Sequence, residues 1–129
     1  MKTDNYILGV DGGGTSTRCY IFNNKGYTLA ELIEEGSNLS FYKRLGIKRI
    51  INLIQNTSSE AGINLSEISA FGFGLAGISD LKQRELFIKE LDRLNISSRS
   101  LILSDTEAAF KLLCPTGIGL VVSIGTGVM

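Results

Sequence analysis

The chain of 129 residues has no histidine, no tryptophan, one proline and two cysteines. Without histidine, catalysis by Ser–His or Cys–His pairs is excluded and most zinc sites lose a ligand. Carboxylates, hydroxyls, lysines and backbone amides remain as the reactive or binding groups. Cys19 and Cys114 have a spacing that fits neither a zinc site nor a CxxC redox motif. We expect both cysteines to be small, buried apolar residues.

The chain also lacks a charge imbalance and a long apolar run. Its 13 basic and 13 acidic residues give a formal net charge of zero, so no overall field draws it to nucleic acid or to an anionic membrane. No apolar stretch approaches the ~20 residues that span a bilayer, and the first residues show no secretion signal. Lysines and arginines are spread over the predicted helix faces, where we expect them to be solvated. We therefore expect a soluble, cytoplasmic protein that needs local contacts to bind phosphate.

Apolar periodicity and turn residues predict an α/β fold with the element order βββαβαβα. The first three strands form antiparallel pairs across turns that contain glycine. Gly62 is the predicted C-terminal cap of the first helix. Asp80 and Gln83 have the spacing of a capping box at the start of the second. The predicted strands are residues 6–10, 15–22, 27–33, 68–75 and 101–103, and the predicted helices are residues 47–61, 80–94 and 106–113, the last stopped by Pro115.

The sequence of the last part of the chain predicts the start of a second structural lobe. Residues 118–124 are almost wholly apolar, as in a strand buried on both faces, and they lead into Gly125, Thr126 and Gly127. This strand and turn predict the opening of a second lobe. We therefore expect residues 1–115 to form one lobe and residues 116–129 to start another, which makes the chain a fragment.

A run of three glycines follows the first predicted strand. Gly12, Gly13 and Gly14 permit close approach of a ligand, and Thr15 adds a hydroxyl and a backbone N–H for phosphate oxygens. Asp11 precedes them with a carboxylate suited to Mg²⁺. The alternative is a loose hairpin turn whose glycines only satisfy backbone geometry. A second turn of the same type, at Gly125–Gly127, strengthens the interpretation as a phosphate site.

Three other positions have both a binding interpretation and a structural one. Asp105 ends a strand, where ligands gather in open α/β sheets, so it is a candidate catalytic carboxylate or a helix cap. Asn38 is a candidate ligand or a turn former. Ala76 and Gly77 leave room for a ligand at the end of a strand, or allow tight packing of the backbone.

Four segments together resemble the actin-like ATPase and sugar kinase superfamily, in particular the N-acetylglucosamine kinase branch that groups with the BadF/BadG/BcrA/BcrD ATPases. The resemblance implies an RNase H-like lobe with a mixed five-stranded sheet, and a cleft for ATP and sugar between two such lobes. It covers the whole chain, but only the N-terminal half of such a protein. The segments are residues 8–15, 72–77, 104–109 and 123–127.

The resemblance assigns roles to the candidate residues. Gly12 to Thr15 and the turn at Gly125, Thr126 and Gly127 would hold ATP phosphates, and Asp11 would orient Mg²⁺ through water. Asn38 would hold the amino sugar, and Asp105 would accept the proton of its hydroxyl. Val128 departs from the family pattern, in which a serine commonly follows. A sugar kinase that works as a homodimer is the implied function of the intact protein.

Three alternatives remain open at this stage. One is an activator ATPase of the same group that drives an iron–sulfur protein; Cys19 and Cys114 are poorly placed for a cluster. Another is a nuclease using Asp11 and Asp105 as metal ligands, against which the glycines and the zero net charge argue. The third is a half-site that binds nucleotide or sugar without catalysis.

Overall fold

The computed structural model describes residues 5–104, 109–113 and 119–123. Two short 3-10 helices, Leu65–Glu67 and Ser97–Arg99, precede β4 and β5. The strands are β1 (Tyr6–Gly12), β2 (Ser16–Asn23), β3 (Thr28–Glu35), β4 (Ile68–Leu75), β5 (Ser100–Ser104), β6 (Ala109–Leu113) and β7 (Gly119–Ser123), and the helices are α1 (Leu39–Tyr42), α2 (Arg44–Ala61) and α3 (Leu81–Arg93).

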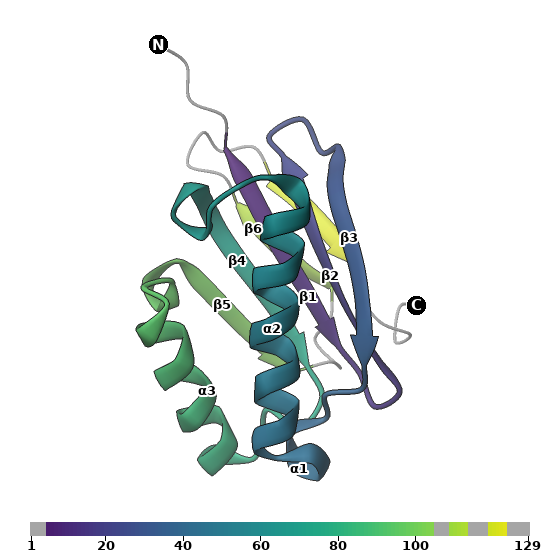
Figure 1. Cartoon of the computed structure of the whole chain (residues 1–129), viewed down its shortest axis with the longest axis vertical. Coiled ribbons are helices and arrows are strands. Elements are labelled where there is room, and N and C mark those ends of the chain that lie inside the picture. Colours follow the sequence, from purple (N-terminus) through teal and green to yellow (C-terminus); the bar gives the residue numbers. More distant parts are fainter. Residues whose placement is uncertain (1–4, 105–108, 114–118, 124–129) are drawn as a thin grey trace.

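Five strands form one mixed sheet in the order β3-β2-β1-β4-β5. The β1–β2 and β2–β3 pairs are antiparallel, whereas β1–β4 and β4–β5 are parallel. Helices α2 and α3 lie side by side over one face of this sheet (Figure 1). The predicted mixed five-stranded sheet, opened by three antiparallel strands, is confirmed.

The core lies between the sheet and the two long helices. Val10 lies beside Cys19 on one side and Phe73 on the other, and all three are fully buried. The rings of Phe73 and Phe87 meet edge to face, with centroids 5.2 Å apart, which joins the sheet to α3. Burial raises the pKa of the Cys19 thiol to about 12, against a smaller opposing effect of a hydrogen bond with Thr57 on α2. Cys19 is therefore the buried small residue that the sequence predicted.

The helix ends follow the sequence signals in part. Gly62 has the left-handed conformation (φ 70°) at the C-terminus of α2, as predicted. Asp80 caps α3 by accepting from the Gln83 backbone N–H at 3.3 Å. The reciprocal half of the capping box is absent, because the Asp80 N–H donates to the Gly77 carbonyl and the Gln83 Oε1 is buried without a partner in the described part of the chain.

The predicted helix at residues 106–113 is wrong. Residues 109–113 form strand β6, which pairs antiparallel with β7. The predicted strand at residues 118–124 is confirmed over residues 119–123. Eight residues are a marginal length for a helix, and the intervening sequence contains Pro115 and Gly117, which favour a turn between two strands. The pairing of β6 with β7 gives both apolar segments a hydrogen-bonding partner, so the order of the described elements ends in two strands.

Several predictions lie outside the described residues. They concern Asp105, Cys114, the turn at Gly125, Thr126 and Gly127, and Val128. The division of the chain after residue 115 also stays a prediction. Among the described helices, none has the length and apolar character needed to cross a bilayer.

Candidate active site

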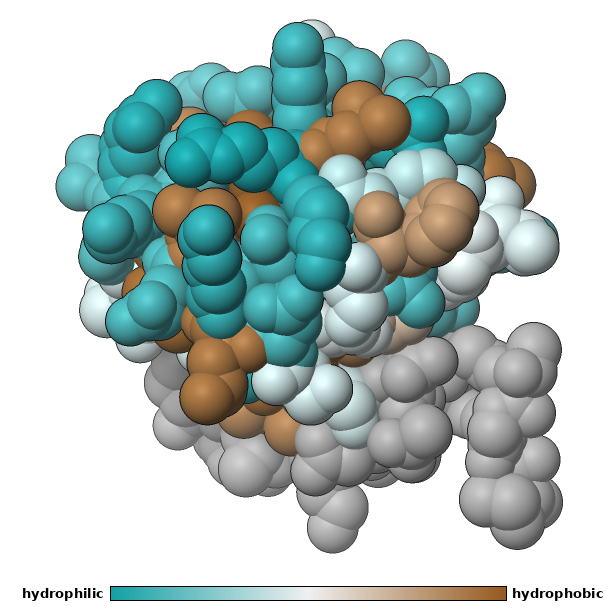
Figure 2. All heavy atoms as spheres, turned by 90° about the horizontal axis from the view of Figure 1, so that it is seen from below, coloured by the Kyte–Doolittle hydropathy of each residue, from teal (hydrophilic) through white to brown (hydrophobic). Residues whose placement is uncertain are grey.

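Three loops meet at the edge of the sheet where β1, β3 and β4 end, the lower edge in Figure 1, which Figure 2 views from below. The Ser37 N–H donates to the Gly13 carbonyl at 2.9 Å, which joins the β3 loop to the β1 loop. The Ala76 N–H donates to the Gly12 carbonyl at 2.8 Å, which joins the β4 loop to β1. The Leu39 N–H donates to the Ala76 carbonyl at 2.9 Å. The structure therefore brings together the first glycine turn, the Asn38 segment and the Ala76–Gly77 segment.

The glycine turn after β1 is closed at its base and open at its tip. The Gly13 N–H donates to the Ser16 carbonyl at 2.9 Å. Gly14 and Thr15 are exposed, and a Cβ at Gly14 would meet no heavy atom within 4 Å. Gly12 belongs to β1 itself, where a Cβ would lie 2.8 Å from the Ser37 Oγ. Gly12 thus allows close packing of the loops, while Gly14 and Thr15 leave free space at the surface.

Gly36 packs directly against the back of this turn. A Cβ at Gly36 would lie 2.1 Å from the Gly14 carbonyl oxygen, closer than any real contact of this kind. Beneath it, the buried hydroxyls of Thr17 and Ser37 hydrogen-bond at 2.7 Å, and the Thr17 hydroxyl also bonds to the Glu35 carbonyl at 2.8 Å. Buried polar groups that satisfy one another give the loops a single arrangement.

Arg49 on α2 holds the same segment from the helix side. Its guanidinium donates to the Gly36 carbonyl at 2.7 Å and lies 2.7 Å from a Glu35 carboxylate oxygen. It also lies over the Tyr42 ring, 4.6 Å from the centroid. The side chain is only 19% exposed. Sequence reasoning treated Arg49 as surface, and only its position on α2 opposite Gly36 reveals its role in placing the loop.

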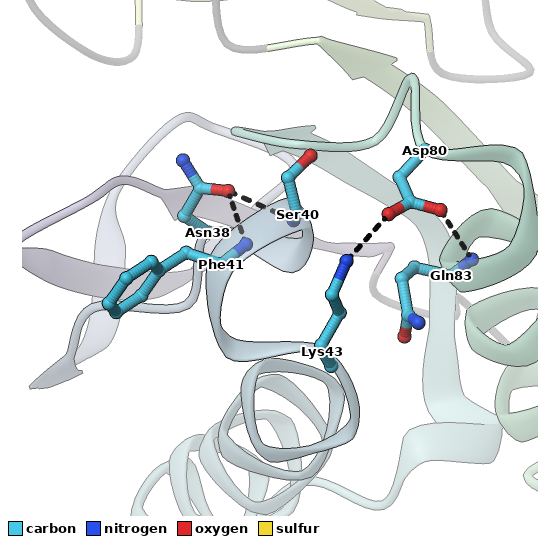
Figure 3. Close-up of polar contacts among 6 residues, drawn as sticks. All are labelled: Asn38, Ser40, Phe41, Lys43, Asp80 and Gln83. Atoms are coloured by element: carbon cyan, nitrogen blue, oxygen red, sulfur yellow. Dashed lines mark hydrogen bonds and ion pairs between the residues drawn. The ribbon is translucent and has the colours of Figure 1, made fainter.

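Asn38 is the N-terminal cap of α1, a helix that the sequence did not predict. Its Oδ1 accepts from the Ser40 N–H at 3.0 Å and the Phe41 N–H at 3.2 Å, and the amide nitrogen points away from the helix (Figure 3). Gly77, with a left-handed φ of 82°, lies against it, since a Cβ there would be 2.6 Å from the Asn38 Oδ1. Asn38 therefore has a structural role as a helix cap rather than as the expected turn former, and its binding role stays a prediction. Among the described residues, the hydrogen bonds that hold α1 use only its Oδ1, not the two N–H donors of Nδ2.

An ion pair links the start of α2 to the start of α3. The Lys43 ammonium lies 3.2 Å from an Asp80 carboxylate oxygen (Figure 3). The hydrogen bond from the Gln83 N–H, followed by that from Lys43, lowers the pKa of the Asp80 carboxyl. Lys43 also has a positive φ of 56°, which turns the chain between α1 and α2. This pair ties the Asn38 segment to the loop that follows β4.

Asp11 lies on β1 between Arg18 of β2 and Gly74 of β4. Since successive side chains of a strand alternate between faces and Val10 faces the helices, the Asp11 carboxylate lies on the opposite face of the sheet. The Tyr20 phenol lies on that face too. Burial raises the pKa of Tyr20 most, the negative charge of Glu31 next, and Asp11 adds a smaller contribution in the same direction.

A family model described as the BadF/BadG/BcrA/BcrD ATPase family matches residues 8–129. The chain belongs to this family. An N-acetylmuramic acid/N-acetylglucosamine kinase of Clostridium acetobutylicum is 27% identical over 123 residues, which are 95% of this chain and 40% of the kinase. A glucosamine kinase of Vibrio cholerae is 27% identical over 81 residues, 63% of this chain and 27% of that enzyme. The chain thus spans less than half the length of these relatives.

Solved structures of similar fold agree with the family assignment. A protein of Chromobacterium violaceum described as an N-acetylglucosamine kinase superimposes with a TM-score of 0.63 and 21% identity, covering 91% of this chain and 48% of that one. The YeaZ protein of Pseudomonas aeruginosa gives a TM-score of 0.54 and 19% identity, covering 81% of this chain and 45% of that one. These likenesses show that the sheet and its helices have the actin-like ATPase fold.

The residues of this BadF-family chain fit a nucleotide phosphate and a magnesium ion. The open tip at Gly14 and Thr15 gives a phosphate group access to backbone N–H donors. Within the part of the chain that the structure describes, no three Asp, Glu, Cys or His side chains gather as a metal cage. Mg²⁺ keeps several waters and binds through one or two carboxylates plus substrate phosphates, so a site with the Asp11 carboxylate as its protein ligand is sufficient for it.

The position of β5 relative to these loops follows from its pairing with β4. Ser104 at the end of β5 lies beside Leu75, which directly precedes Ala76. Asp105 is the next residue in the chain after Ser104. The last described residue of β5 therefore ends at the same edge as the three loops, while the side chain of Asp105 lies outside the described residues.

Proposed function

We propose that the intact protein is an ATP-dependent kinase that transfers the γ-phosphoryl group to a hydroxyl of an amino sugar such as N-acetylglucosamine. The family membership and the two curated kinases support this class of reaction. One structural observation gives the proposal its strongest support. The hydrogen-bonded loops after β1, β3 and β4 form a rigid base at one edge, and the Gly14–Thr15 tip above it is open.

The proposed work of the chain is to position groups and neutralise charge, which are the main needs of phosphoryl transfer. In the turn from Gly12 to Thr15, the backbone N–H groups of Gly14 and Thr15 hold phosphate oxygens, because the Gly13 N–H already donates to the Ser16 carbonyl. The Asp11 carboxylate orients Mg²⁺ through water. ATP supplies the transferred phosphoryl group, and Gly125, Thr126 and Gly127 form the second phosphate loop.

The sugar is proposed to lie next to Asn38. Its Nδ2 donates to an oxygen of the sugar, because the Oδ1 is already committed to the backbone of α1. Ala76 and Gly77 pack tightly against the Asn38 segment at the end of β4 and so hold Asn38 in position beside the proposed sugar. Asp105 accepts the proton of the attacking hydroxyl. An unperturbed carboxylate with a pKa of about 3.9 is a weak base, so orienting the hydroxyl is its larger contribution.

The 129-residue chain on its own holds nucleotide from one side, because the relatives that it matches are more than twice as long. We expect it to bind ATP weakly and to be inactive. A cytoplasmic location and a homodimer are proposed only for the intact protein.

The test is a panel of sugars assayed with ATP and Mg²⁺ on the intact protein and two variants. Asp105→Asn is expected to reduce turnover by about 10²-fold or more, as loss of a catalytic proton acceptor does, while nucleotide binding is retained. Asp92→Asn, at an exposed position of α3, is the matched control and is expected to keep full activity. Unchanged turnover of Asp105→Asn would refute its role, and no phosphorylated sugar from any member of the panel would refute the function.

The activator ATPase alternative requires cysteines that ligate an iron–sulfur cluster. Cys19 does not suit this task, since it is fully buried in the core and its pKa is raised to about 12. An iron-dependent absorbance in the purified intact protein would restore that alternative.

A further inference from the structure

A groove of about 480 Å³ lies between α2 and α3. Both helices lie over the same face of the sheet (Figure 1), and the groove residues all come from these two helices. None of the residues placed in the candidate active site lines it. The groove is therefore separate from the proposed ATP and sugar positions.

Four cationic side chains line the groove. Arg44 and Lys48 come from α2, and Lys89 and Arg93 come from α3. Glu90 is the one acidic residue among the lining residues, and it pairs with Arg93 at 3.4 Å. Within residues 5–104, Arg44, Lys48 and Lys89 have no carboxylate at ion-pair distance. The groove thus concentrates positive charge in a chain whose net charge is zero.

The spacing of these cations costs stability in the free protein. Arg44 and Lys48 are four residues apart, and so are Lys89 and Arg93. Like charges at this spacing on a helix repel each other and destabilise it. An anion bound between the two helices removes both repulsions. From the sequence we expected solvated lysines and arginines spread over helix faces, whereas the fold places four of them around one groove.

The floor of the groove is apolar. Ile47 is buried, and Ile51 and Leu86 are half-buried at its base. A ligand that fills the groove therefore meets hydrocarbon below and cations at both walls. The volume lies in the range of small-molecule pockets, about 300–1,000 Å³.

We propose that this groove binds a small organic phosphate with an apolar body. The apolar body lies on Ile47, Ile51 and Leu86, and the phosphate lies between the α2 and α3 cations. Guanidinium groups suit this ligand because their planar N–H donors match phosphate oxygens two at a time. The groove is thus a second phosphate-binding site, independent of the proposed catalytic one.

The probe for the test is 1-naphthyl phosphate, titrated into the full chain in the absence of ATP and sugar, with NMR or fluorescence detection. We expect saturable binding at one site that weakens as salt is raised. Lys48→Glu and Lys89→Glu are each expected to weaken binding by about tenfold, because each replaces an attraction by a repulsion. Lys25→Glu makes the same charge change in the exposed β2–β3 turn and is expected to leave binding within about twofold.

Three outcomes would overturn the proposal. The first is the absence of saturable binding. The second is binding that is unchanged in both Lys48→Glu and Lys89→Glu. The third is that Lys25→Glu weakens binding as much as the two groove variants do. Inorganic phosphate is the second probe, and binding as tight as that of naphthyl phosphate would refute the role of the apolar floor. Lys48→Gln and Lys89→Gln, checked by circular dichroism, repeat the test with a smaller change to the helices. None of these measurements depends on kinase activity, so the proposed function is tested separately.

Discussion

The carboxyl edge of the sheet contains two kinds of glycine. Gly36 and Gly77 are pressed against backbone atoms of neighbouring loops, where a Cβ would come within 2.1 Å and 2.4 Å of them. Gly14, whose carbonyl oxygen lies against Gly36, has open space where its own Cβ would point. The first kind fixes the arrangement of the loops, and the second leaves the surface accessible.

This difference shows that a glycine-rich motif can combine a glycine required for packing, Gly12, with one that leaves open space, Gly14. The run at residues 12–14 is the conspicuous feature of the sequence. The fold relies more on two isolated glycines, because each sits where two loop backbones come too close for any side chain. The tip of the run at Gly14 is the part available to a ligand. Substitutions at packed and open glycines test the comparison directly.

Gly77→Ala is expected to have the largest effect on stability, a loss of about 4 kcal/mol. It combines a left-handed φ of 82° with a Cβ 2.4 Å from the Ser40 nitrogen, so the cost of the strained backbone adds to that of overpacking. Gly62→Ala is the matched control, with a φ of 70° but open space, and should lose about 1 kcal/mol. Urea unfolding of both variants measures the difference, and equal losses would contradict the account.

Gly36→Ala is expected to lose about 2–3 kcal/mol, because the new methyl group forces the Gly14 turn or its own strand to shift. The loss is smaller than at Gly77 because the contacted turn is exposed and can move. Gly14→Ala should change stability by less than about 0.5 kcal/mol. In the intact protein, however, it should impair ATP use, since the methyl group fills the space proposed for phosphate. A stable Gly36→Ala variant would refute the packed interpretation.

Thr17→Val is expected to lose about 1–2 kcal/mol, since it keeps the shape of the side chain but leaves the Ser37 hydroxyl and the Glu35 carbonyl short of a buried partner. Adding Ser37→Ala removes one of these unsatisfied groups. The double variant should therefore lose less than the sum of the two single variants. Strict additivity in thermal or urea unfolding would show that the two hydroxyls do not act together.

Asp80→Asn is expected to have a small effect on stability, and one that depends on pH. The folded state holds the pKa of Asp80 below its unfolded value. Its contribution to stability is therefore present above the unfolded pKa, about 3.9, and is lost as the pH falls through the folded pKa. The wild type should be more stable than the variant at pH 7, and the two should converge towards pH 3. Lys43→Met removes the ion-pair partner of Asp80. If the ion pair contributes, the stability of this variant should depend less on pH than that of the wild type.

Much of the fold could be predicted from the sequence because local signals agreed with the tertiary structure. Alternating apolar residues gave the strands, and Gly62 gave the end of α2. Residues 109–113 were assigned to the wrong element because a short apolar segment suits a helix or a strand, and only pairing with β7 decides between them.

The candidate site could be predicted only for residues within recognisable motifs. The glycine turn, Asn38 and Gly77 were found in this way, and the structure brings them together. Arg49, Gly36 and the Thr17–Ser37 pair were missed. Their roles depend on contacts between segments far apart in the chain, and such contacts cannot be predicted from the local spacing of residues.

The most direct test is a structure of the intact protein with Mg²⁺ and a non-hydrolysable ATP analogue. We predict that the phosphate oxygens accept hydrogen bonds from backbone N–H groups of the turn between Gly12 and Thr15. The Asp11 carboxylate should contact a water bound to Mg²⁺, and the Asn38 side chain should face the proposed sugar position. An analogue bound elsewhere, with the Gly14 tip left exposed to solvent, would contradict it.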